Sequence, residues 1–132
     1  WGVVAQESSA SIQLGTREGK YGEQLVDSKG ITLYLFDADS PGKSTCYGEC
    51  AIEWPPLLVP SGKSVTASGN AQASLVGTTN RTDNTTQVTY NGWPLYYYIG
   101  DKVPGDVTCQ GVKSFGDFWW LVKPDGTKNT KT

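Results

Sequence analysis

Gly30-Ile-Thr-Leu-Tyr-Leu-Phe-Asp-Ala-Asp39 returns 62 positions further along the chain as Gly92-Trp-Pro-Leu-Tyr-Tyr-Tyr-Ile-Gly-Asp101. Both segments follow the pattern G-x-x-L-Y-x-[FY]-x-x-D. A pattern that recurs within one chain defines the unit from which the fold is built. We therefore take this sequence as two copies of one structural unit and work outward from these segments.

Two further blocks extend the repeat in the same order. Pro41–Gly48 aligns with Pro104–Gly111 at an offset of 63, sharing Pro-Gly, Thr-Cys and a final Gly. Trp54–Gly62 aligns with Phe118–Gly126 at an offset of 64. The offset grows by one residue between blocks, as single insertions in loops would produce. Three blocks in one order indicate an internal duplication.

Each unit is predicted to form about three antiparallel strands. Short apolar runs rich in Tyr, Val, Ile and Trp lie between Gly, Pro, Asn and Ser residues, which is typical of strands and turns. Asn91-Gly92 is a strong hairpin signal because both residues tolerate positive φ. The predicted fold class is all-β: two pseudo-symmetric antiparallel β repeats packed as one sandwich-like or barrel-like domain. A turn near Glu49–Glu53 is the one helix expected.

The predicted organisation has three parts. Residues 1–20 form an N-terminal extension, although a strand near Ser11–Leu14 is a candidate to pair with a sheet edge. Residues 21–126 form a single β domain made of repeats 21–63 and 75–126, joined by a linker rich in Ser, Gly and Ala. Residues 127–132 form a tail.

Composition excludes several classes of function. The 132 residues contain no His and no Met, which removes Ser-His-Asp and Cys-His catalysis and Met-ligated copper or haem. The net charge of −2 with scattered Lys and Arg argues against binding nucleic acid. The apolar runs are too short to span a membrane, and a signal segment, if one existed, is expected to be gone already. We expect no catalytic residues, no metal, no cofactor and no enzymatic activity.

The segment Leu33–Leu57 resembles a known family, the secreted repeat of unknown function. It has the family's Y-x-[FWY]-x-x-D pattern, a C-x-G-x-C pattern at Cys46–Cys50 and a following Trp-Pro-Pro run. Gly111–Trp119 is similar to the family's G-Q-G-V-x-x-F-G-x-x-W stretch. The resemblance implies an extracytoplasmic location, with any lipid tether outside this chain. It departs from the family at Cys109, where other members usually carry Gly.

The three cysteines leave alternatives open. In a secreted domain, Cys46 and Cys50 are expected to form a local disulfide. The competing interpretations are a redox or copper-binding dithiol and a bond between Cys46 and Cys109, which occupy equivalent positions in the two repeats. Otherwise, Cys109 is a free or intermolecular thiol.

Several other residues are candidates for structural or surface roles. The repeat-motif residues are expected to be structural, with the two carboxylates accepting backbone N–H groups of the loops that they open; these residues are Tyr34, Phe36, Asp39, Tyr96, Tyr98 and Asp101. The aromatic residues that are not duplicated, and so favoured for a surface patch, are Trp93, Tyr97 and Trp120. Asn80 and Asn84 begin N-glycosylation sequons.

These observations favour a non-enzymatic structural or binding module of the cell envelope. A subunit of a surface assembly or of a membrane complex is one form that such a module takes. Its expected partner is another envelope or surface protein, or a second copy of the chain. A redox or metal-handling accessory domain that uses the Cys46–Cys50 pair is the alternative. Glycan binding by exposed aromatic residues is a weaker one.

Overall fold

A computed structural model describes residues 12–60 and 63–131. The regular secondary structure of the described chain is mostly strand, which confirms the predicted all-β class, and the five-residue helix α2 lies at the predicted Glu49–Glu53. The elements are β1 (Ile12–Gly19), β2 (Gly22–Val26), β3 (Tyr34–Phe36), α2 (Glu49–Glu53), β4 (Val65–Ala67), a 3-10 turn (Ala73–Leu75), β5 (Val76–Asn80), β6 (Thr86–Tyr90), β7 (Trp93–Pro94), β8 (Val112–Ser114), β9 (Asp117–Val122) and β10 (Lys128–Asn129).

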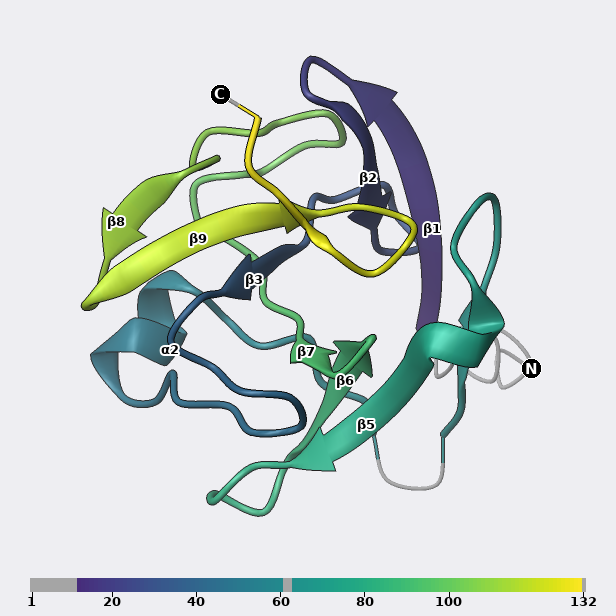
Figure 1. Ribbon diagram of the computed structural model, residues 1–132. Coiled ribbons are helices and arrows are strands. Elements are labelled where there is room, and N and C mark those ends of the chain that lie inside the picture. The colour runs from purple at the N-terminus through teal and green to yellow at the C-terminus, as the bar shows by residue number, and fades with distance from the viewer. Residues whose placement is uncertain (1–11, 61–62, 132) are drawn as a thin grey trace, which may run out of the picture.

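The strands form three small sheets (Figure 1). One has the order β2-β1-β4, in which β1 and β4 are parallel and the other pair is antiparallel. A second has the order β5-β6-β7, and its predicted hairpin turn at Asn91-Gly92 has φ values of 53° and 84°. The third has the order β10-β9-β3, with β8 paired to β9. None of the described helices is long and apolar enough to cross a membrane.

An approximate twofold axis passes between Tyr34 and Tyr96. Their backbones form an antiparallel bridge, in which the Tyr34 N–H donates to the Tyr96 carbonyl at 2.8 Å and the Tyr96 N–H donates to the Tyr34 carbonyl at 2.9 Å. Tyr34 also pairs with Leu121 of the second repeat, and Tyr96 pairs with Pro56 of the first. Each repeat therefore places its last strand segment beside the other repeat.

This pairing corrects the alignment of the third sequence block. Because Leu121 pairs with Tyr34 as Pro56 pairs with Tyr96, Leu121 corresponds to Pro56, and the offset is 65 rather than 64. Trp119, not Phe118, is consequently the counterpart of Trp54. Both tryptophans are fully buried, whereas Phe118 is 38% exposed. Matching by residue type was misleading here because three aromatic residues follow one another at 118–120.

The fold extends beyond both predicted ends of the domain. Ile12–Leu14 pair with β4 and Gly15–Gly19 pair with β2, so β1 belongs to the domain rather than to an extension; Ser11 lies outside the described residues. At the other end, β10 pairs with β9, and Asn129 is buried. The predicted boundaries at residues 20 and 127 therefore leave out residues that pair within the sheets.

The core has two parts, and β3 contributes to both. Leu33 and Leu35 belong to an aliphatic cluster, whereas Tyr34 and Phe36 belong to an aromatic cluster that also contains the three cysteines. Alternate residues of an extended strand point to opposite sides, so one short segment can serve both clusters. The approximate twofold axis passes through the aromatic cluster, which we take as the candidate site.

Candidate functional site

The aromatic cluster is symmetric about the axis. Trp54 and Trp119 stack on it, with ring centroids 3.9 Å apart and planes within 4° of parallel. Tyr34 meets Trp54 edge-on at 5.4 Å, and Tyr96 meets Trp119 edge-on at 5.1 Å. Edge-on contacts of this kind are among the preferred arrangements of aromatic rings. The two halves thus build one shared stack rather than two separate cores.

The outer rings of the stack differ between the two halves. Phe36 stacks on Trp119 at 4.0 Å, and Tyr98, in the equivalent position, lies 4.6 Å from Trp54 at a 45° tilt. Phe36 is only 2% exposed, whereas Tyr98 is half-buried. One end of the stack therefore carries a phenol close to solvent, and the other ends in a buried hydrocarbon ring.

Two tyrosine–aspartate pairs link the repeats reciprocally. The Tyr34 hydroxyl donates to Asp101 Oδ2 at 2.6 Å, and the Tyr96 hydroxyl donates to Asp39 Oδ2 at 2.7 Å. Each tyrosine thus bonds to the aspartate of the opposite repeat. Hydrogen bonds to an ionised acceptor are about twice as strong as neutral ones. In each repeat, the Y-x-[FY]-x-x-D pattern supplies a tyrosine donor and an aspartate acceptor, and each donor bonds to the acceptor of the other repeat.

The second carboxylate oxygen of each aspartate closes the loop that follows it. Asp39 Oδ1 accepts from the Thr45 N–H at 2.8 Å and from its hydroxyl at 2.6 Å. Asp101 Oδ1 accepts the same two bonds from Thr108, at 3.1 Å and 2.7 Å. The carboxylates therefore do accept loop N–H groups, as their repetition in the sequence suggested, and each also receives a tyrosine from across the axis.

Burial controls the protonation of these groups. It is the main cause that raises the pKa of Tyr34, and the hydrogen bond to Asp101 raises it further. Burial and the nearby charge of Asp39 likewise raise the pKa of Tyr96. Loss of hydration also raises the pKa of the Asp39 carboxyl, although its hydrogen bonds and Arg81 oppose the shift. Both phenols therefore remain protonated donors at neutral pH.

Arg81 is a site residue that the sequence analysis did not identify. Its side chain is only 1% exposed. It donates from Nη1 to Ser44 Oγ at 2.8 Å and to Gln87 Oε1 at 2.9 Å, and from Nη2 to the Cys46 carbonyl at 2.5 Å. Ser44 in turn shares a hydrogen bond with the Tyr96 hydroxyl. The positive charge therefore lies beside the Tyr96–Asp39 pair.

The cysteines adopt the first of the pairings considered. Cys46 and Cys50 form a disulfide, and Cys109 is a free, buried thiol. Burial raises the pKa of Cys109, which keeps the thiol protonated and weakly reactive. Its backbone N–H points at the Tyr34 hydroxyl at 3.4 Å. Among the residues that the structure describes, no three His, Cys, Asp or Glu side chains are grouped as metal ligands would be.

The three unduplicated aromatic residues are half-buried rather than fully exposed. Trp93, Tyr97 and Trp120 all pack against the aliphatic cluster. The Tyr97 hydroxyl donates to Asp27 Oδ2 at 2.7 Å, and the Trp120 indole N–H donates to Asp37 Oδ2 at 2.8 Å. Asn80 and Asn84 are both exposed beside the turn between β5 and β6, where their use as glycosylation sites stays a prediction.

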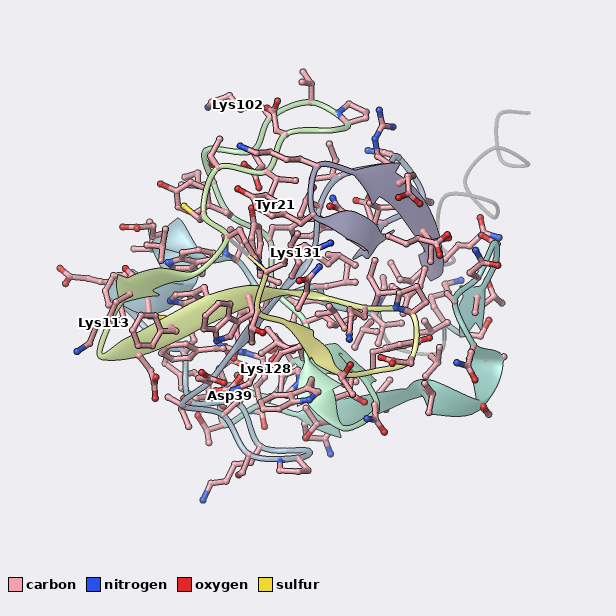
Figure 2. The ribbon with its side chains drawn as sticks, turned by 45° about the horizontal axis from the view of Figure 1, so that its top comes forward. Tyr21, Asp39, Lys102, Lys113, Lys128 and Lys131 are labelled. Carbon is pink, nitrogen blue, oxygen red and sulfur yellow. A yellow bond between two sulfur atoms is a disulfide. The ribbon has the colours of Figure 1, made fainter. Side chains whose placement is uncertain are left out.

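Exposed apolar side chains lie instead on several parts of the described chain, and the β8–β9 hairpin carries three of them. Phe115 and Phe118, which we call the hairpin patch, are 45% and 38% exposed, whereas Val112, which is 36% exposed, lies on the opposite face of the hairpin from Phe118. Phe118 stacks on Trp120 with centroids 5.7 Å apart, and Lys113 lies 6.0 Å from the Phe118 ring. Figure 2 shows the Lys113 side chain projecting away from the ribbon at this hairpin. The repeat does not mark this patch, because at the offset of 65 Phe118 corresponds to Glu53, which is charged.

Fold and site together define a duplicated all-β domain whose halves exchange strands and hydrogen bonds. A family model described as the secreted repeat of unknown function matches the chain twice, over residues 15–58 and 77–123. The chain belongs to this family, as its motifs indicated. Comparison with curated proteins and comparison with solved structures each found no match.

Proposed function

We propose that the protein is a non-enzymatic structural and binding module of the cell envelope, a subunit of a surface assembly or of a membrane complex. The family description supports a setting outside the cytoplasm. The tyrosine–aspartate pairs support a structural role for the repeat motif, because their polar atoms bond inside the fold. Its partner is another envelope protein, bound through the hairpin patch.

The backbone at Phe115 is the observation that carries this proposal. Phe115 has a φ of 57°, a conformation that costs a bulky residue about 1–3 kcal/mol. The other two non-glycine residues with positive φ in the described chain are Asn84 and Asn91, which tolerate it well. Phe115 and Gly116 form the two-residue turn between the paired residues Ser114 and Asp117, a turn that needs positive φ, and Phe115 is 45% exposed there. An aromatic ring held outward at such a cost is well suited to contact a partner.

The test is sedimentation of labelled protein with purified envelopes of the source organism. Phe115→Asn relieves the strained backbone, so the variant is expected to be more stable by about 1 kcal/mol. It is nevertheless expected to bind the envelopes more weakly than the wild type. Ile52→Asn, at a 69% exposed position on α2, is the matched control and leaves binding unchanged. Equal binding by wild type and Phe115→Asn, or no binding by either, contradicts the proposal.

A further inference from the structure

We infer that the aromatic cluster is a one-electron relay, in which an oxidant acting at the surface draws an electron through Tyr98 and Trp54 from the buried Tyr34–Asp101 pair. This activity is separate from envelope binding and does not rest on it. The ligand class is a one-electron oxidant small enough to reach the half-buried Tyr98 ring. The relay delivers the oxidising equivalent to a buried phenol.

The rings form a continuous sequence of contacts from surface to core. Tyr98 is half-buried and lies 4.6 Å from Trp54, and Trp54 meets Tyr34 at 5.4 Å, centroid to centroid. Both Trp54 and Tyr34 are fully buried. Tyrosine and tryptophan are the side chains that lose one electron most readily among aromatic residues, and ring contact favours transfer between them. No step in this sequence requires a group outside the chain except the oxidant.

The final step moves an electron and a proton to different acceptors. The oxidant takes one electron through Tyr98 and leaves Trp54 as a radical cation. Tyr34 returns one electron to Trp54, and its phenolic proton passes along the 2.6 Å hydrogen bond to Asp101 Oδ2. The products are a neutral Trp54, a neutral Tyr34 radical, a protonated Asp101 and the reduced oxidant. Charge and atoms balance, and the transient charge on Trp54 is removed when Tyr34 returns the electron, so the products leave no new charge in the core.

Trp54 is suited to pass the oxidation on rather than keep it. Its indole N–H is buried and has no hydrogen-bond partner among the residues that the structure describes. The Trp54 radical cation therefore has no adjacent acceptor for its proton and remains a strong oxidant. Trp119 differs, because its indole N–H donates to the Ser114 carbonyl at 2.9 Å. The N–H without a partner thus belongs to Trp54, the tryptophan that also contacts Tyr98.

The other half of the stack has its own tyrosine–aspartate pair but lacks the outer ring at which the oxidation enters. Where Tyr98 contacts Trp54, the equivalent ring on Trp119 is Phe36, which is buried and hard to oxidise. The oxidation therefore enters at Tyr98, which contacts Trp54, and Trp54 in turn contacts Tyr34. This difference between the outer rings favours Tyr34.

The twofold axis supplies a matched pair of variants for the test. A laser flash in the presence of tris(bipyridine)ruthenium(II) and persulfate generates a ruthenium(III) oxidant, and electron paramagnetic resonance of freeze-quenched samples measures tyrosyl radicals. We expect Tyr34→Phe to lose the long-lived tyrosyl signal and Tyr96→Phe to retain it. Tyr98→Phe, which copies Phe36 of the other half, is expected to slow its appearance. Near-ultraviolet circular dichroism checks that each variant is folded.

Asp101→Asn keeps the test decisive if Tyr34→Phe fails to fold. It leaves the phenol in place but removes its proton acceptor, so the long-lived signal is again expected to be lost. A signal that disappears in Tyr96→Phe but survives in Tyr34→Phe, that survives in all the folded variants, or that appears at wild-type speed in Tyr98→Phe overturns the relay. Each of these results can be told apart from a failure of envelope binding, which is measured without an oxidant.

Discussion

At the scale of single residues, this domain buries polar side chains in pairs rather than leaving its interior apolar. Tyr34, Tyr96 and Tyr97 each donate to an aspartate, and Arg81 satisfies three acceptors at once. A buried group left without its partner costs more than the pair contributes, so such networks hold the chain to one arrangement. Substitutions within them should therefore have large effects whose sign and pH dependence follow from the contacts.

Tyr97→Phe tests one such pair. The Tyr97 hydroxyl donates to Asp27 at 2.7 Å, so its loss is expected to cost about 1.5–3 kcal/mol at neutral pH. Burial, and then the bond to Asp27, raises the pKa of Tyr97 in the folded state. That contribution is complete below the unfolded-state pKa of about 10 and is lost as pH rises beyond it. Urea unfolding at a series of pH values should show that the variant loses less stability at alkaline pH than the wild type.

Tyr21→Phe, at a half-exposed ring, is the control and should change stability by less than about 0.5 kcal/mol.

Arg81→Leu tests the buried cation. The substitution leaves Ser44, Gln87 and the Cys46 carbonyl without their donor, so we expect it to destabilise the fold by about 3–5 kcal/mol. Urea denaturation followed by tryptophan fluorescence measures the change. Arg17→Leu, on the exposed part of β1, is the control and should stay within about 0.5 kcal/mol of wild type. Similar stabilities for the two variants would show that the Arg81 contacts do not support the fold.

At the scale of elements, the sequence predicted what local chemistry specifies and missed what distant pairing decides. The Asn91-Gly92 turn and α2 were predicted because turn residues and short-range spacing define them. β5 was missed because neither of its faces is buried, so it carries no alternating pattern. The repeat could not predict that Tyr34 and Tyr96 each bond to the aspartate of the other copy. The repeated residue types are identical whether a tyrosine bonds to the aspartate of its own copy or to that of the other copy.

The last strand provides a prediction at this scale. A chain that ends after Gly126 loses β10 and the buried Asn129, whose amide donates to the Tyr21 carbonyl at 2.9 Å and whose carbonyl accepts from Gln110 at 2.5 Å. Two half-buried polar groups, the Tyr21 carbonyl and the Gln110 side-chain amide, then lose these hydrogen bonds, so we expect a loss of about 1–3 kcal/mol. Thermal and urea unfolding compare this chain with one that ends at Lys131. If residues 127–132 are instead a dispensable tail, the two chains will have the same stability.

At the scale of the whole molecule, the two repeats depend on each other. Trp54 stacks on Trp119 across the axis, β3 of the first repeat pairs with β9 of the second, and the Tyr34–Asp101 bond again joins the two. A single repeat would expose one face of this stack and leave a tyrosine and an aspartate unpaired. Three-stranded units of this size bury too little surface to be stable by themselves.

We therefore predict that the halves fold only together. A protease site inserted between Gly69 and Asn70, both exposed, allows the folded protein to be cut without separating its core. The cut protein is expected to elute as one species in gel filtration and to keep its near-ultraviolet circular dichroism, because the contacts across the axis do not depend on the connecting chain. Separation in urea and removal of the denaturant should leave each half unfolded, and mixing the halves should restore the spectrum. The same cut made after Trp54→Ala/Trp119→Ala, which removes the stack, is the control and should release the halves. A half that folds alone, or cut halves that part under native conditions, would show that the reciprocal contacts are not what holds the molecule together.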